Sequence, residues 1–196
     1  MTTRPDWQDV LDFWFLAPCE PGHLRPRQAW FQKSAAFDAE ILSRFGAQIE
    51  VAVAGGLRAW DAHPEGTLAR ILLLDQFTRN VWRGTARAFS GDALARAAAQ
   101  RLVATGLHLA LRPVQRVFAY LPFEHAEDLV LQRRCVALYQ DLARVAGQEY
   151  KGYVDYAERH RDVIARFGRF PHRNAQLGRP STDEELAFLT QPGSSF

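Results

Sequence analysis

Apolar side chains recur along this chain at helical spacing. One stripe repeats every four residues: Phe37, Ile41, Phe45, Ile49 and Val53. This period places the stripe on one face of an amphipathic helix. The helix is expected to begin after Ser34, which is a good N-cap, and to end at the glycine pair 55–56, because glycine adopts the left-handed conformation without strain.

The middle of the chain carries three further helix signals. One helix is predicted from Pro64 through the segment ILLLDQFTRN, whose first half is apolar on every side and should be buried. Ser90 is expected to cap the next, alanine-rich helix, which Gly106 closes. Pro113 then opens a helix that should stop near Pro122, because proline disfavours the helical conformation in the residue before it.

Both ends of the chain also predict helices. Thr3 and Asp6 have the spacing of a capping box, and Pro5 suits a first helical turn. In the loop that follows, Trp30 and Phe31 are expected to anchor the chain to the core. The remaining helices are predicted over residues 124–146, over residues 148–167 and after a capping box at Ser181 and Glu184.

Together these signals predict an all-α fold, since no segment alternates between apolar and polar residues with the period of a strand. We expect seven to eight antiparallel helices in stacked hairpins, within a single helical domain over residues 1–196. Hydrophobic residues make up 47% of the sequence and charged residues 23%. This composition is typical of a globular protein and not of a disordered one.

Charge and cysteine content limit which cellular compartment and which kinds of partner the sequence predicts. The net charge of +2 is too small to attract the chain to nucleic acid or to a membrane surface. The sequence has neither an N-terminal signal core nor an apolar run of roughly 18 residues, and Cys19 and Cys135 lack metal-binding spacing. We therefore expect a cytoplasmic protein with two reduced thiols, no membrane partner, no metal and no cofactor.

Three polar groups interrupt the apolar pattern and are candidates for a site. The first follows the buried stretch of the helix from Pro64: Asp75, Gln76, Arg79, Asn80 and Arg83. Asp75 with Arg79, and Gln76 with Asn80, are four residues apart and can pair along one helix face. Because buried polar groups need partners, this group either lines a polar cavity or fixes the register of neighbouring helices.

The second group is Glu124, His125, Glu127 and Asp128. Carboxylates in a first helical turn stabilise the positive end of the helix, which is one interpretation. The other is an acid–base or metal cluster, in which Glu124 and Asp128 share a helix face and His125 is a ligand. No HExxH spacing occurs, so a metal site is not predicted.

The third group lies in the segment RHRDVIARFGRFPHRNAQLGRPST, residues 159–182. His160 follows Tyr153 and Tyr156 on one predicted face, which suits either a core histidine or a ligand. Beyond Gly168 the loop holds a run of cationic and amide side chains: Arg169, His172, Arg173, Asn174 and Arg179. Arginine forks beside a helix start could bind a carboxylate or phosphate, or they could neutralise the carbonyls at the end of the preceding helix.

Five blocks of the sequence, taken in order, are similar to one bacterial family. The blocks are VLDFWF, ILLLDQFTRNVWRGTARAF, YLPFEHAED, HRDVIARFGRFPHRNAQLGR and STDEELAFL. They resemble the signatures of domain-of-unknown-function family 924, over nearly the whole chain. The resemblance implies an all-helical, tetratricopeptide-repeat-like superhelical architecture, and it implies no activity. Family patterns carry serine where this chain has Ala126, so a hydroxyl group is missing from that block.

The sequence predicts a protein that binds a small anionic ligand in an arginine- and histidine-lined pocket between the helix from Pro64 and the loop 168–179. The predicted ligand-binding residues are Asp75, Gln76, Arg79, Asn80, Arg83, His125, Arg169, Arg173, Asn174 and Arg179. If a reaction is catalysed, the candidates are Glu124, His160 and His172. The alternative is a peptide- or protein-binding scaffold with a groove lined by tryptophans. Nucleic-acid binding is disfavoured by the small net charge, and neither a GxSxG elbow nor a nucleotide-binding glycine loop is present.

Overall fold

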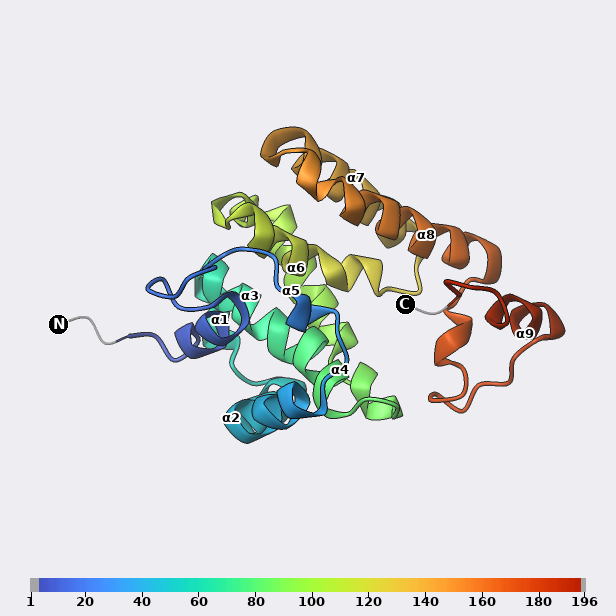
Figure 1. Cartoon of the computed structure of the whole chain (residues 1–196), viewed down its shortest axis with the longest axis horizontal. Coiled ribbons are helices and arrows are strands. Elements are labelled where there is room, and N and C mark those ends of the chain that lie inside the picture. The colour runs from blue at the N-terminus through green and yellow to red at the C-terminus, as the bar shows by residue number, and fades with distance from the viewer. Residues whose placement is uncertain (1–3, 195–196) are drawn as a thin grey trace. The chain divides into compact units, whose positions relative to one another are not determined.

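The computed structural model describes residues 4–194 of the chain. Within that range no residue lies in a strand, which confirms the predicted all-α fold class (Figure 1). The α-helices are α1 (Gln8–Phe15), α2 (Ala35–Val53), α3 (Pro64–Ile71), α4 (Thr78–Val81), α5 (Asp92–Ala104), α6 (Pro113–Glu124), α7 (Leu129–Ala146), α8 (Lys151–Phe167) and α9 (Asp183–Leu189). A π-helical segment, η3 (Leu72–Phe77), joins α3 to α4, and short 3-10 turns occur in several of the other connections.

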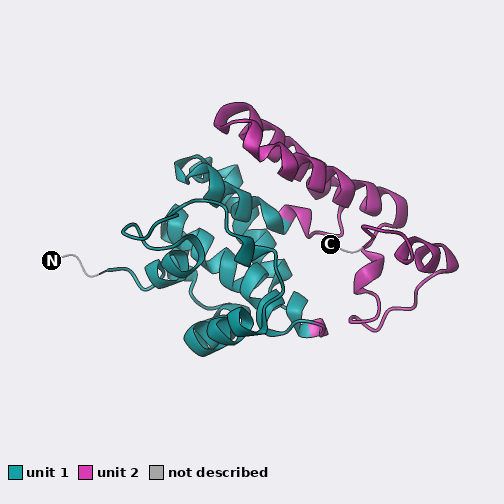
Figure 2. Ribbon diagram, viewed as in Figure 1, with its two compact units in different colours: residues 1–83, 87–122 teal, residues 84–86, 123–196 magenta. Residues whose placement is uncertain are grey.

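The chain divides into two compact units (Figure 2). Unit 1 comprises residues 1–83 and 87–122, and unit 2 comprises residues 84–86 and 123–196. Helix α6 contributes to both units, because it begins in unit 1 and ends at Glu124. The expectation of a single domain over the whole chain stays a prediction.

Aromatic side chains form the core of unit 1. Trp14 of α1 is fully buried, and its ring centroid lies 5.4 Å from that of Phe77 and 5.5 Å from that of Phe118. The indole nitrogen of Trp30 and the guanidinium of Arg27 both donate to the Trp14 carbonyl at 2.8 Å. These donors satisfy a carbonyl group that the end of α1 leaves without a helical partner, so the following loop is held against the core.

The structure confirms the predicted helix α2 at both ends. The Ser34 hydroxyl accepts a hydrogen bond from the backbone N–H of Phe37, as an N-cap should, and Gly55 adopts a φ of +90° just beyond the helix. Ile41 and Ile49, in the middle of the predicted stripe, are completely buried. Local capping chemistry and the four-residue period therefore suffice to place this helix.

The helix from Pro64 is also present, but its hydrogen bonding changes along its length. Helix α3 passes into the π-helical segment η3 and then into α4. The apolar residues 71–74 are completely buried, as their pattern predicted. A π-helical turn shifts the residues after it relative to regular α spacing, and such turns occur frequently at functional sites.

The start of α5 differs from the prediction. Helix α5 begins at Asp92 without a side-chain cap, and the Ser90 hydroxyl donates to the Arg87 carbonyl at 2.7 Å instead. Gly91 occupies the N-cap position, where an added Cβ would lie 2.1 Å from the carbonyl oxygen of Leu74. A close approach between backbones therefore decides where this helix starts, and a propensity for capping by serine does not.

The end of α6 was also predicted wrongly. Pro122 lies inside the helix, which continues to Glu124. Leu121 and Phe123, on either side of the proline, are buried. Packing of these side chains outweighs the local preference of the residue before proline for an extended conformation.

Unit 2 contains the hairpin of α7 and α8, which lie side by side (Figure 1). Tyr139 of α7 and Tyr153 of α8 stack with their ring centroids 5.9 Å apart. The prediction of a helix from Glu124 is wrong at its start, because Asp128 caps α7 and accepts from the backbone N–H groups of residues 130 and 131. Glu124 therefore belongs to α6, and the two carboxylates do not share a helix face.

Helix α9 begins one residue later than predicted. The capping box pairs Thr182 with Glu185, where the sequence analysis favoured Ser181 with Glu184. Both pairs combine a hydroxyl side chain with a glutamate three residues later, so local sequence does not separate them. The choice follows from Glu185, whose buried carboxylate also accepts hydrogen bonds from Arg169.

Three smaller expectations are also corrected. Helix α1 begins at Gln8 without a side-chain cap, and the predicted partner Thr3 lies outside the described residues. Phe31 is 64% exposed and does not anchor its loop, whereas Trp30 is buried as expected. Tyr156 is 54% exposed and so does not share the buried face that His160 occupies.

Candidate functional site

In unit 1 the predicted polar group lies where η3 passes into α4. Asp75 is buried and accepts a hydrogen bond from the Gln76 side chain at 2.7 Å. Arg79 lies 3.3 Å from the Asp75 carboxylate, which confirms the predicted pair. Its guanidinium also donates hydrogen bonds to both carboxylate oxygens of Asp92, at 2.7 and 3.0 Å. Because Asp92 is the first residue of α5, Arg79 joins α4 to α5.

Asn80 and Arg83 both bind the carboxylate of Asp38. The Asn80 amide donates at 2.7 Å, and the Arg83 guanidinium donates to both oxygens at 3.1 Å. The predicted pair of Gln76 with Asn80 does not form, because both side-chain amides donate to carboxylates. Since Asp38 lies in the first turn of α2, these contacts tie α4 to α2 and account for both polar residues structurally.

In unit 2, chemically active side chains from distant segments meet around the buried ring of Phe170. We call these five residues the Phe170 cluster: Glu124, His125, His160, His172 and Arg173. The imidazole centroids of His160 and His172 each lie 5.6 Å from the centroid of the Phe170 ring, and the guanidinium carbon of Arg173 lies 4.4 Å from it. The structure thus brings the three catalytic candidates, Glu124, His160 and His172, into one place.

Polar contacts within the Phe170 cluster involve both side chains and backbone. The Nδ1 atom of His160 lies 3.6 Å from the Glu124 carboxylate, and Arg173 donates to the carbonyl of His125 at 3.0 Å. Glu124, His160 and Arg173 are each no more than 6% exposed. Ionisable groups are seldom buried to this extent, so the cluster is either a structural network or a site.

The backbone around the Phe170 cluster is held at two points. Gly168 ends α8 in the left-handed conformation, which turns the chain so that Phe170 packs against Val163 and Ile164. On the other side, the buried amide of Gln132 donates to the carbonyls of residues 124 and 126, at 2.5 and 2.8 Å. These contacts position the short connection from α6 to α7 that carries His125.

Two further arginines of the loop 168–179 bind carboxylates of unit 2. The Arg169 guanidinium donates to both carboxylate oxygens of Glu185, at 2.6 and 2.8 Å. The Arg179 guanidinium donates in the same way to Glu127, at 2.6 and 2.9 Å. Glu127 also accepts from the backbone N–H of Phe170 at 2.8 Å. Burial alone would raise the pKa of Glu127, but the Arg179 and backbone hydrogen bonds outweigh it and hold that pKa below its ordinary value. Arg169 and Arg179 thus hold the loop in place.

Asn174 completes this arrangement. It is buried, and its amide nitrogen donates to Ser181 at 3.0 Å and to Glu185 at 3.2 Å, while its amide oxygen accepts from Arg179. Sequence reasoning selected Asn174 and both arginines but missed the carboxylates that bind them. Glu127 lies 52 residues before Arg179, so no local spacing could have indicated that pair.

Burial sets the protonation of His160. The imidazole Nδ1 lies 2.9 Å from the carbonyl oxygen of Tyr156, and because a carbonyl only accepts, Nδ1 carries the proton. Burial, together with smaller effects of the nearby His125, Arg173 and His172, lowers the pKa of His160 to about 3, although the bond to Tyr156 opposes them. His160 is therefore uncharged at neutral pH.

Metal binding and the Cys135 thiol can both be checked in the described residues. Among residues 4–194, no three or more His, Cys, Asp or Glu side chains are arranged to hold a metal ion. Cys135 is buried, and burial, together with the Glu124 carboxylate, raises the pKa of its thiol well above the ordinary value. In the same range no helix combines the length and apolar composition needed to cross a membrane.

Comparison with known proteins assigns the chain to a family. The profile of the family described as "Bacterial protein of unknown function (DUF924)" matches residues 10–193. The chain belongs to this family. A solved structure, "Structure of Protein of Unknown Function ATU0120 from Agrobacterium tumefaciens", is 42% identical in sequence, with a TM-score of 0.80. The match covers 93% of this chain and 96% of that one. No curated protein matches the chain.

The two polar groups of this DUF924 protein belong to different units: Asp75 and Arg79 to unit 1, and the whole Phe170 cluster to unit 2. Each group is assembled from residues within the region that the family profile matches. The tryptophans, by contrast, offer little lining for a peptide groove. Trp14, Trp30 and Trp60 are all at most 8% exposed, so they serve the core of unit 1.

Proposed function

We propose that this protein binds a small carboxylate or phosphate compound at the Phe170 cluster. One observation carries the proposal: a guanidinium and two imidazoles lie at a single buried phenyl ring within one unit, with the Glu124 carboxylate beside one of the imidazoles. Arg173 supplies the positive charge, and its planar fork suits two oxygens of an anion. Imidazole nitrogens add hydrogen bonds that fix the orientation of the ligand.

Binding without proton transfer by His160 fits this geometry best. A group that transfers protons is most effective when its pKa lies near the working pH, and the His160 pKa of about 3 is far below neutrality. Glu124 beside it accepts hydrogen bonds when ionised. Glu124 therefore favours a ligand that carries a hydroxyl group as well as its anionic group.

The proposal is tested by thermal unfolding in the presence of hydroxylated anions. Malate and glycerol phosphate are suitable probes, with inorganic phosphate as a probe for the anionic group alone. A probe present at about 100 times its Kd should stabilise the wild type by about 2.7 kcal/mol, which raises Tm by roughly 5–10 °C in a protein of this size. Arg173→Gln should abolish that increase, because it removes the charged fork.

The matched control is Arg161→Gln, which removes the same charge from a half-buried residue of α8 outside the Phe170 cluster. It should keep the full response to the probe. Because Arg173→Gln can also weaken the fold, a second measurement uses the wild type alone. The NMR signals of the His160 and His172 imidazoles should shift when the probe is added. The signals of His63, which lies in unit 1, should not shift. Unchanged His160 and His172 signals, with no rise in Tm for any probe, would overturn the proposal.

A further inference from the structure

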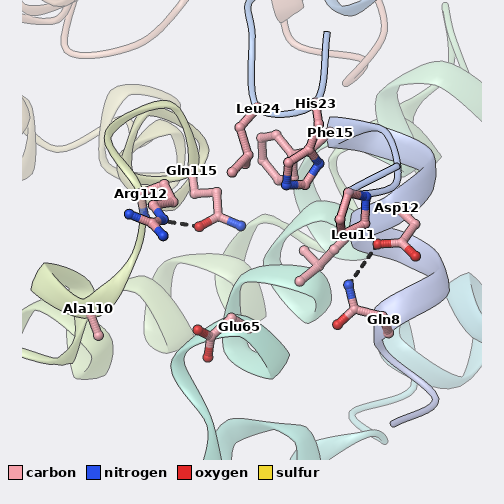
Figure 3. A pocket seen from close by; sticks show the side chains of 11 residues that line it. Gln8, Leu11, Asp12, Phe15, His23, Leu24, Glu65, Ala110, Arg112 and Gln115 are labelled. Atoms are coloured by element: carbon pink, nitrogen blue, oxygen red, sulfur yellow. Dashed lines mark hydrogen bonds between the residues drawn. The ribbon is translucent and has the colours of Figure 1, made fainter. Parts of the chain in front are cut away.

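Unit 1 contains a pocket that none of the predicted residues lines. Its volume is about 240 Å³, and α1, the loop after α1, the start of α3 and the start of α6 surround it (Figure 3). At about 30 Å³ for each water molecule, the pocket has room for about eight waters. It therefore suits a compact metabolite and is too small for a nucleotide or a peptide.

One side of the pocket carries hydrogen-bond donors. The Gln115 amide oxygen accepts from the backbone N–H of Arg112 at 2.9 Å. This bond leaves the donating amide nitrogen of Gln115 facing the space between the labelled side chains (Figure 3). Arg112 lies beside it, directly before α6, where the helix dipole adds positive potential. Among residues 4–194 the Arg112 guanidinium has no carboxylate partner.

The other side carries acceptors. Glu65 lies in the first turn of α3, and its carboxylate makes no hydrogen bond or ion pair within the described part of the chain. The Asp12 carboxylate accepts from Gln8 at 2.7 Å and from Arg4 at 2.5 Å, and Arg4 also pairs with Asp9 at 2.8 Å. Among residues 4–194, Arg112 and Glu65 are therefore the cation and the anion that line the pocket without an ion-pair partner.

The loop that closes the pocket adopts a costly conformation. Leu16 has φ 66° and ψ 153°, a region that is essentially restricted to glycine, and Leu24, which lines the pocket, has φ 58°. Such conformations cost on the order of 1–3 kcal/mol each and cluster at ligand sites. They place His23, whose Nδ1 donates to the Leu16 carbonyl at 2.6 Å, against the pocket. In the neutral ring, Nε2 is then an acceptor.

We infer that this pocket binds a small zwitterion of the amino-acid class. The carboxylate of the ligand pairs with Arg112 and accepts from the Gln115 amide nitrogen. Its ammonium group pairs with Glu65. The short carbon chain between them packs on the apolar side chains of Leu11 and Leu24, which also line the pocket. This site lies within unit 1 and is independent of the Phe170 cluster.

The test is calorimetric titration of the full chain with glycine, β-alanine and 4-aminobutanoate, whose two charges lie progressively further apart. At least one of them should bind with a Kd below about 10 mM, a weak but measurable affinity for so small a ligand. Acetate and ethylammonium, which each carry one of the charges, should bind at least about tenfold more weakly. Loss of one charged hydrogen bond accounts for a difference of that size.

Two variants test whether Glu65 and Arg112 bind the charged groups of the ligand. Glu65→Gln and Arg112→Gln should each weaken binding of the best zwitterion about tenfold or more. The charge-matched controls Glu158→Gln and Arg133→Gln, both in unit 2, should leave its Kd unchanged. The inference is overturned if no zwitterion binds, if a singly charged probe binds equally well, or if neither Glu65→Gln nor Arg112→Gln alters the Kd. None of these outcomes affects the response to anions that depends on Arg173.

Discussion

The arginine side chains of the loop 168–179 have different roles although they lie close together in the sequence. Arg169 and Arg179 donate to the carboxylates of Glu185 and Glu127 and fix the loop, and Arg173 packs over the ring of Phe170 and donates to the His125 carbonyl. Sequence composition selected all three as anion-binding residues. It could not separate them, because the difference depends on Glu127 and Glu185, which only the folded chain brings within reach.

Glu185 yields a prediction about acid stability. Hydrogen bonds from Arg169 lower its pKa to about 2 against an ordinary value of 4.5, although burial opposes them. Between these values the unfolded chain binds more protons than the folded chain, so the free energy of unfolding falls as the pH drops from about 4.5 to about 2. Glu185→Gln should be less stable than the wild type at about pH 6 and should lose less stability on acidification.

Urea unfolding followed by circular dichroism at several pH values measures this slope. The slope for Glu185→Gln should be smaller than that of the wild type by up to one proton. Glu184→Gln is the control, since this neighbouring carboxylate is 62% exposed and should leave the slope unchanged. Parallel stability curves for the wild type and Glu185→Gln would contradict the role assigned to the Arg169 pair.

At the scale of elements, two glycines make opposite predictions. A Cβ on Gly91 would lie 2.1 Å from the Leu74 carbonyl oxygen, so Gly91→Ala forces α5 away from η3 and should destabilise the protein by about 2 kcal/mol or more. A Cβ on Gly152, in the first turn of α8, meets nothing within 4 Å. Gly152→Ala should stabilise the protein by up to about 1 kcal/mol, because alanine loses less backbone entropy.

Chemical denaturation of both alanine variants provides the measurement. The free energy of unfolding should fall for Gly91→Ala and rise for Gly152→Ala. Opposite changes would show that the effect at Gly91 is steric and is not a general effect of replacing glycine. If Gly91→Ala were as stable as the wild type, the close approach of α5 to η3 would not be what sets the start of that helix.

Helix boundaries divide into those that local chemistry decides and those that packing decides. Ser34 caps α2 and glycine ends it, as the sequence predicted, because both effects act within one turn. The starts of α5 and α7 and the passage of α6 through Pro122 were predicted wrongly. At α5 and α6, contacts with buried neighbours outweigh the propensity of a single residue, and at α7 the Asp128 side chain caps the helix four residues after the predicted start.

At the scale of the whole molecule, the division into two units raises the question of whether they unfold together or separately. Helix α6 continues from unit 1 into unit 2, and the chain passes between the units at residues 83–84, 86–87 and 122–123. Because unfolding of either unit would disrupt that shared helix, we expect both to unfold in one transition. The five tryptophans all lie in unit 1, so their fluorescence reports on that unit alone.

Urea unfolding followed by tryptophan fluorescence should therefore coincide with unfolding followed by far-ultraviolet circular dichroism, which reports on both units. Gly152→Ala, a change in unit 2, should shift the fluorescence transition as well. Separate transitions, or a fluorescence midpoint that Gly152→Ala leaves unmoved, would show two independently folding domains in place of the single predicted one.

The sequence alone determined the all-α class, the main helices and the residues from which the Phe170 cluster is built. These features depend on the helical period and on contacts within a turn or two, so they can be read locally. Only the tertiary structure decided that His160 is buried and uncharged, which arginines bind carboxylates, and that α1, α3 and α6 enclose a pocket around Glu65 and Arg112. Burial and charge pairing depend on residues tens of positions apart, and no local pattern records which of them meet.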